Sequence, residues 1–182
     1  MTHQSILHIL LEFNLNTSKF EFTTLNSGLI NDTYLVSGDT GQQYILQKIN
    51  HKVFKNPEVL MNNINYTLPS LSANDYAQIT FLSTTDGQNC LKKDDEFWRI
   101  MTFIPNSTTY DTTTDTDIAF EAGRIIGRFH DLLKTVDVEI IEDTLPKFHN
   151  LAYRTQEFKE ALKKTTPIMR TYLLEFAIMI PN

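Results

Sequence analysis

Apolar residues in the first fifty positions change from a helical to an alternating spacing. Between residues 5 and 13 they recur at helical intervals, and Ser5 is a suitable cap, so we expect a short helix there. Phe20 and Phe22 alternate with polar neighbours and predict a first strand. Residues 33–36 and 44–49 are rich in β-branched and aromatic side chains and predict two more strands.

The next fifty residues predict one helix between strands. Asn56 is a suitable N-cap, Pro57 suits the first helical position, and Glu58 lies where the helix dipole favours a carboxylate. We expect this helix to end near Pro69. Strands are predicted over residues 77–83 and 97–104.

The remainder of the chain is helical in pattern after a polar linker. Residues 106–116 are rich in Ser, Thr and Asp, and Asp115 or Asp117 is a suitable cap for a helix that begins there. Gly123 and Gly127 are spaced so that another element could approach the helix closely. Helices are predicted over residues 117–134, 155–164 and 171–180.

This order of elements predicts an α+β fold. A five-stranded antiparallel sheet with one inserted helix comes first, and a helical region comes after it. We expect three parts: a sheet domain over residues 1–104, a hinge or linker over 105–116, and an incomplete helical region over 117–182.

Composition and charge narrow the range of partners. The net charge of −6, without a Lys/Arg-rich face, argues against a nucleic-acid partner. The single cysteine, Cys90, excludes an internal disulfide framework and favours a reducing compartment. No segment approaches the ~18 apolar residues of a membrane span, so we expect a cytoplasmic protein with no membrane partner.

Residues 27–48 carry the clearest chemical pattern. They read as a short polar loop, a strand, a glycine-containing turn and a strand that ends near Lys48. Backbone amides and small polar side chains can cover phosphates, while a strand holds one cation in place, so the pattern indicates a nucleotide-phosphate site. Lys48 could instead be a solvated strand-end lysine, and residues 31–33 could simply form a turn.

Three aspartates near the linker are a weaker candidate for chemistry. Asp111, Asp115 and Asp117 could be metal ligands, but their spacing does not match a calcium loop, and helix capping accounts for the last two. We therefore expect no metal site in these residues.

Several segments in the right order resemble the N-terminal part of the aminoglycoside phosphotransferase/choline kinase superfamily, which has a protein-kinase-like fold. Within it, the chain is most similar to the bacterial N-acetylhexosamine 1-kinases. The segments that carry this resemblance are Gly28–Val36, Tyr44–His51, Val53–Pro57, Phe97–Ser107, Thr109–Asp111, Glu121–Phe129 and Leu145–Asn150.

The resemblance implies a nucleotide site in a kinase-like N-lobe. It assigns the phosphate-covering loop to residues 28–33, the phosphate-binding cation to Lys48, and the carboxylate that orients this cation to Glu58. The strand and hinge beside adenine would be the run from Met101 to Pro105. The implied nucleotide-binding residues are Gly28, Asn31, Thr33, Lys48, Glu58, Met101, Phe103 and Ile104.

The catalytic half of the implied enzyme does not occur in these residues. The family's catalytic loop contains a His-x-Asp motif, whereas His130 and Asp131 are adjacent here and His149 precedes Asn150. Because phosphoryl transfer depends on positioning and on charge neutralisation by Mg²⁺, we expect the chain alone to be inactive. We expect the ligands of Mg²⁺ to lie in a missing C-terminal part.

The resemblance leaves two hypotheses. The first is the N-terminal part of an ATP-dependent phosphotransferase that acts on the anomeric hydroxyl of an N-acetylhexosamine, with an aminoglycoside or choline as other acceptors. Its partners would be a nucleotide and a small-molecule sugar. The second is a stand-alone, non-catalytic nucleotide-binding or interaction module, which would bind ATP weakly or not at all.

Overall fold

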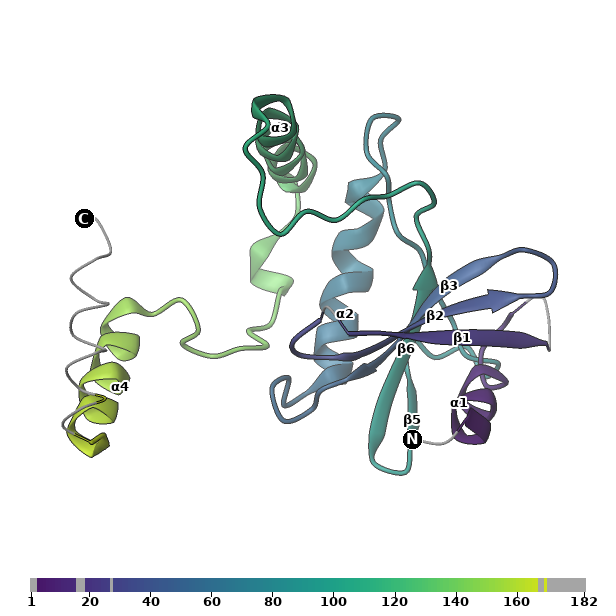
Figure 1. The fold of residues 1–182 in the computed structure, drawn as a ribbon, viewed down its shortest axis with the longest axis horizontal. Coiled ribbons are helices and arrows are strands. Elements are labelled where there is room, and N and C mark those ends of the chain that lie inside the picture. Colours follow the sequence, from purple (N-terminus) through teal and green to yellow (C-terminus); the bar gives the residue numbers. More distant parts are fainter. Residues whose placement is uncertain (1–2, 16–18, 27, 167–168, 170–182) are drawn as a thin grey trace. The chain divides into compact units, whose positions relative to one another are not determined.

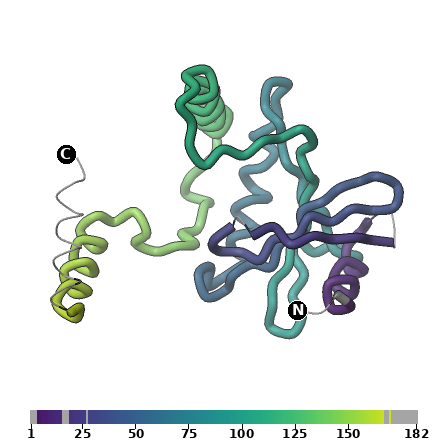
Figure 2. The backbone as a smooth tube through the Cα atoms, viewed as in Figure 1, coloured from purple at the N-terminus to yellow at the C-terminus, as the bar shows by residue number. Residues whose placement is uncertain are grey.

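The computed structural model describes residues 3–15, 19–26, 28–166 and 169 of the 182-residue chain. By its contacts the chain divides into two compact units, Met1–Thr144 and Leu145–Asn182. The first unit contains the sheet and the helices that pack on it, and the second contains one described helix (Figures 1 and 2). The predicted boundaries near residues 105 and 117 do not coincide with this division, and the lobe boundaries stay a prediction.

One antiparallel sheet forms the centre of the first unit (Figure 1). Its strand order is β1-β2-β3-β6-β4, and β5 pairs with β6 from outside this path. The strands are β1 (Phe20–Leu25), β2 (Asp32–Gly38), β3 (Gln43–Ile49), β4 (Phe81–Leu82), β5 (Leu91–Lys93) and β6 (Glu96–Thr102). A sheet followed by helices confirms the predicted α+β fold class.

The sheet differs from the prediction at one side. β4 covers two residues rather than residues 77–83, and β5 was not predicted. β5 and β6 form a hairpin whose turn residues, Asp94 and Asp95, both have positive φ (51° and 59°). Two consecutive positive φ values give the type I′ turn that suits the twist of a two-residue hairpin. Aspartate tolerates this conformation, so the turn forms without glycine.

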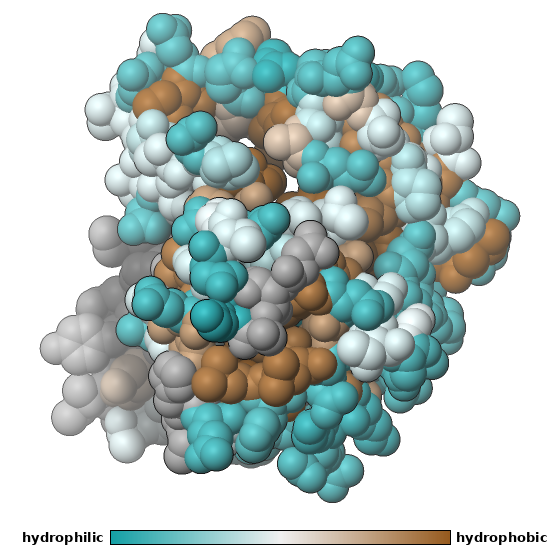
Figure 3. Space-filling model, turned by 90° about the vertical axis from the view of Figure 1, so that its right-hand side faces the viewer, coloured by the Kyte–Doolittle hydropathy of each residue, from teal (hydrophilic) through white to brown (hydrophobic). Residues whose placement is uncertain are grey.

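Helix α1 (His3–Leu10) covers one face of the sheet. Trp98, Leu46 and Ile100 are fully buried on this face, and the side chains of α1 pack against them. The core cluster consists of Ile6, Ile9, Leu10, Phe13, Tyr34, Val36, Tyr44, Leu46, Trp98 and Ile100. Seen from the side on which α1 lies, the remaining apolar surface is divided into patches bordered by polar residues (Figure 3).

Helix α2 (Pro57–Thr67) begins as predicted. The Asn56 side chain accepts a hydrogen bond from the Val59 amide at 3.3 Å, and Pro57 occupies the first turn. Met61 is buried and its sulfur lies 3.8 Å from Arg99 Nη1, which places α2 over β6. A short 3₁₀ helix, Leu68–Leu71, contains Pro69 and ends this region.

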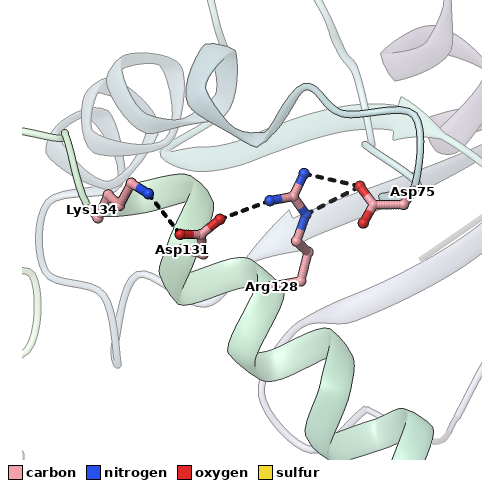
Figure 4. A network of polar contacts seen from close by, with 4 residues as sticks. All are labelled: Asp75, Arg128, Asp131 and Lys134. Atoms are coloured by element: carbon pink, nitrogen blue, oxygen red, sulfur yellow. Dashed lines mark hydrogen bonds and ion pairs between the residues drawn. The ribbon is translucent and has the colours of Figure 1, made fainter.

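Helix α3 (Thr116–Leu133) is capped by Asp115, whose carboxylate accepts from the amides of Asp117 and Ile118. Figure 4 shows how its Arg128 bridges two aspartates: Asp75, in the segment after the first 3₁₀ helix, at 3.1 Å, and Asp131 at 2.8 Å. The predicted close approach at Gly123 and Gly127 is wrong for the described residues, since a Cβ at either would meet nothing within 4 Å.

A second 3₁₀ helix, Val138–Ile140, comes after α3. The backbone of Glu142 is held by Asn63 of α2, which donates to its carbonyl at 2.7 Å and accepts from its amide at 3.1 Å. This pair of hydrogen bonds joins residues on either side of the first unit's polar linker.

The second unit contains α4 (Leu151–Lys164), which begins four residues earlier than predicted. Asn150 caps it, accepting from the Tyr153 amide at 2.9 Å. Within the same unit, the Arg154 guanidinium lies 5.5 Å from the Phe148 ring and donates to the Phe148 carbonyl at 3.2 Å. The helix predicted over residues 171–180 falls outside the described residues.

Candidate nucleotide site

The loop over residues 28–33 is fixed to the sheet at its middle. The Asn50 amide donates to Asn31 Oδ1 at 3.0 Å, and the Asn50 side chain donates to the Ile30 carbonyl at 3.1 Å. Leu29 is fully exposed at the tip. The loop is therefore held at Ile30 and Asn31 and open at Leu29, which suits a segment that closes over a ligand.

Strand alternation places the candidate residues on two different faces. Tyr34, Leu46 and Ile100 are register partners, and two residues along lie Asp32, Lys48 and Trp98. These six side chains share the face that α1 covers. Thr33, Gln47 and Arg99 are also register partners, and they share the face on which α2 packs.

Lys48 therefore lies on the α1 face. Its ammonium pairs with the Glu96 carboxylate and lies 6.0 Å from the centre of the Trp98 ring. The implied pairing with Glu58 is not formed, because Glu58 begins α2 on the opposite face. Lys48 also lines a small pocket of about 210 Å³ at the base of the loop, together with Asp32 and Asn50.

Glu58 lines a different pocket, of about 360 Å³, formed with Met61, Asp86 and Cys90 among others. Burial, followed by the negative charge of Glu58, raises the pKa of the Cys90 thiol above its usual value of 9.0. Cys90 is thus kept protonated, which does not favour a role as a nucleophile.

A polar network crosses three strands on the α2 face. Gln47 accepts from Arg99 Nε at 3.0 Å and from Arg99 Nη2 at 2.8 Å. Its own amide nitrogen donates to Thr33 Oγ1 at 3.2 Å, and Thr33 Oγ1 lies 3.4 Å from the Asn31 carbonyl oxygen. The guanidinium on β6 is thus linked through one glutamine to the end of the loop.

The predicted hinge comes directly after β6. Met101 is buried, while Phe103 and Ile104 are half-buried. The Phe103 amide donates to the Gln43 carbonyl, and the Ile104 carbonyl accepts from Ser107 Oγ at 2.8 Å. Among the backbone hydrogen bonds of the described loops, none engages the Phe103 carbonyl or the Ile104 amide, so these two groups are available to a base.

The sequence of residues 21–170 matches the model of the phosphotransferase enzyme family, which includes aminoglycoside phosphotransferases. This match spans more than half of the chain. The chain belongs to the phosphotransferase enzyme family.

Two solved structures share the fold of this phosphotransferase-family chain. Spectinomycin phosphotransferase, APH(9)-Ia, in complex with ADP and spectinomycin, is 12% identical with a TM-score of 0.52. The match covers 77% of this chain and 40% of that one. Amicoumacin kinase hAmiN, in complex with AMP-PNP, Ca²⁺ and Ami, is 14% identical with a TM-score of 0.62, covering 100% of this chain and 55% of that one.

This phosphotransferase-family chain therefore spans about half the length of the kinases whose fold it shares. Its described residues contain no group of three His, Cys, Asp or Glu side chains placed to hold a metal ion. In the same residues no helix is long and apolar enough to cross a membrane.

Three residues of the site were missed in the sequence: Gln47, Glu96 and Arg99. Alternation along β3 could have separated Gln47 from Lys48, since neighbouring strand residues point to opposite faces. Glu96 depends on the β5–β6 hairpin, for which the sequence has no glycine turn. Arg99 lies inside a run that is otherwise apolar, which was the available signal.

Proposed function

We propose that this chain is the N-terminal, nucleotide-binding part of an ATP-dependent small-molecule kinase whose acceptor is the anomeric hydroxyl of an N-acetylhexosamine. The observation that carries the proposal is the family match over residues 21–170, which includes the loop, the sheet and the hinge in one continuous stretch. The folds of two kinases of small antibiotics support the reaction class.

The nucleotide would lie on the α2 face of β1, β2 and β3. On the other face the α1 core buries Tyr34, Leu46 and Ile100, and the pocket beside Lys48, of about 210 Å³, is small. On the α2 face, Leu35 and Ile45 remain half-buried and give the apolar surface that a base requires. The Phe103 carbonyl and Ile104 amide would bind the base, and the loop with Gly28, Asn31 and Thr33 would cover the phosphates.

The nucleotide would supply the transferred phosphoryl group, and the residues of this chain would bind and orient it. No group of described residues is placed to hold the divalent metal that such transfers use. The metal and the group that receives the acceptor proton would come from residues outside the family match. We therefore propose that the 182 residues bind nucleotide without turnover, in the cytoplasm where ATP is supplied.

The choice of a sugar acceptor rests on the resemblance to the N-acetylhexosamine kinases, which the segments between Gly28 and Asn150 carry together. A second candidate is an antibiotic, because both kinases of shared fold are named for one. Measurement of ADP release with N-acetylgalactosamine, N-acetylglucosamine, spectinomycin and choline would separate these acceptors.

The assay needs the longest translated product, so the gene would first be sequenced past the codon for Asn182. We expect the longer product to release ADP fastest with an N-acetylhexosamine and the 182-residue chain to release none above background. Turnover by the 182 residues alone would contradict the proposed division of roles. Preference for an antibiotic or choline would contradict the proposed acceptor while leaving the kinase assignment in place.

A further inference from the structure

Arg99 is a cation in the middle of the sheet that has no acidic partner among the described residues. It lies on β6 between the buried residues Trp98 and Ile100, and its guanidinium is stacked 5.3 Å from the centre of the Phe81 ring. In the part of the chain that the structure describes, Arg99 forms no ion pair. Its hydrogen bonds go to neutral groups instead: the Gln47 amide oxygen and the Met61 sulfur.

The partly buried positive charge of Arg99 is not neutralised by an anion among the described residues. Burial lowers the pKa of the Arg99 guanidinium below its usual value of 12.5, because desolvation penalises the charged form. An arginine remains protonated in proteins, so the charge persists and favours an anionic partner. Its contacts with Gln47 and Met61 engage three of the five N–H donors of a guanidinium, which leaves two for a ligand.

The surroundings of Arg99 connect it to the loop that would cover phosphates. The Gln47 side-chain oxygen accepts hydrogen bonds from two N–H groups of Arg99. The Gln47 amide nitrogen in turn donates to Thr33, the last residue of that loop. Because the side chains of Arg99 and Thr33 both lie on the α2 face, a group bound under the loop would lie on the same surface as the guanidinium. Figure 1 shows β2, β3 and β6 side by side in one sheet.

Lys48 does not have these properties. Its charge is already matched by Glu96, and it stands on the face that α1 closes. Lys48 meets the loop at its register partner Asp32, with which it shares the small pocket, and the Asp32 carboxylate disfavours a phosphate there.

We propose that Arg99, rather than Lys48, is the cation that this sheet offers to the phosphate groups of a nucleotide. The inference rests on the proposed nucleotide-binding function and adds to it the residue that carries the charge. Gln47 is then a positioning residue: it holds the planar guanidinium in place and couples it to Thr33.

The test compares single variants of the 182-residue chain by calorimetric titration at low salt. Arg99→Met removes the charge, and Gln47→Glu keeps Arg99 but gives it an internal carboxylate partner. Lys48→Met removes the competing cation, and Lys134→Met, at the exposed C-cap of α3, controls for the loss of one positive charge. The probes are ATP, inorganic tripolyphosphate and adenosine.

We expect Arg99→Met and Gln47→Glu each to weaken ATP and tripolyphosphate about tenfold or more, since a charge-assisted contact is lost. Adenosine affinity should stay within about twofold in every variant, because adenosine carries no phosphate. Lys48→Met should behave like Lys134→Met. If Arg99→Met fails to fold, Gln47→Glu still tests the proposal. This variant keeps Arg99 in place and replaces its amide contact with an ion pair at the same site.

Weakening by Lys48→Met but not by the Arg99 and Gln47 variants would overturn the inference and leave the nucleotide site intact. Tripolyphosphate binding that depends on Arg99, without ATP binding, would uphold Arg99 as the phosphate-binding cation but contradict the proposed nucleotide-binding function. Failure of the unmodified chain to bind either ATP or tripolyphosphate would overturn both.

Discussion

At the scale of single residues, the two faces of the sheet treat positive charge differently. On the α1 face, Lys48 finds a carboxylate in Glu96, so its charge is neutralised locally. On the α2 face, Arg99 is held only by neutral acceptors among the described residues. The Lys48–Glu96 pair is partly exposed and so contributes modestly to stability, whereas hydrogen bonds to a more fully desolvated charge contribute more, so Gln47 should matter more to the fold than Glu96.

Replacement of Gln47 by Leu should therefore be costly. The change leaves Arg99 without its acceptor, and we expect the free energy of unfolding in urea to fall by about 1.5–3 kcal/mol. Gln43→Leu is the matched control, because the Gln43 side chain is exposed and donates only a long hydrogen bond to Ser37, at 3.5 Å. Equal losses in the two variants would show that the acceptor role of Gln47 does not stabilise the chain.

At the scale of elements, local sequence signals predicted some helices and strands, whereas other features of the fold depend on long-range packing. Asn56 and Asp115 cap α2 and α3 as predicted, because a cap is a contact within three residues. β1, β2 and β3 were also predicted from local composition. β5 was not, since three residues and an Asp-Asp turn carry no strand pattern. The faces of Lys48 and Arg99 depend on where α1 and α2 pack, which no local pattern specifies.

The attachment of α3 is an ionic contact with a definite pH dependence. The hydrogen bond from Arg128 lowers the pKa of Asp75, and the hydrogen bond from Lys134, followed by Arg128, lowers the pKa of Asp131. A carboxyl whose folded pKa lies below its unfolded value stabilises the fold above the unfolded pKa, near 3.8. That contribution disappears as the pH falls through the folded pKa.

The measurable consequence is a difference between the unmodified chain and Asp75→Asn. We expect the unmodified chain to have the higher thermal midpoint at about pH 6 and the two midpoints to converge as the pH falls through the lowered folded pKa of Asp75. Asp111→Asn serves as the control, since Asp111 is an exposed aspartate of the linker. A difference that persists or grows at low pH would contradict the role of the Asp75–Arg128 pair.

At the scale of the whole molecule, the first unit is held together by a core that joins the start of the chain to β6, far along the sequence. Leu10 and Trp98 are both fully buried in it. This packing closes one face of the sheet, and the proposed surface for a ligand is the half-buried area around Leu35 and Ile45 on the α2 face. The fold was thus predictable from local patterns, whereas the open face became clear only from the packing of α1.

Adjacent leucines in this segment provide a direct test of that packing. Leu10 is fully buried and Leu11 is 55% exposed. We expect Leu10→Ala to lower the free energy of unfolding by about 2–5 kcal/mol and Leu11→Ala to change it by less than about 0.5 kcal/mol. Chemical denaturation of the two variants provides both values, and similar small losses would mean that α1 does not close this face.

We propose that a nucleotide binds the α2 face between the loop of residues 28–33 and the hinge. This proposal is tested most directly by recording amide chemical shifts of the isotope-labelled 182-residue chain while ATP is added. We expect the amide chemical shifts of Thr33, Gln47, Arg99 and Ile104 to change and those of the α1 residues Ile6 and Leu10 to stay the same. Changes centred on α1 and Lys48, or none at millimolar ATP, would contradict it.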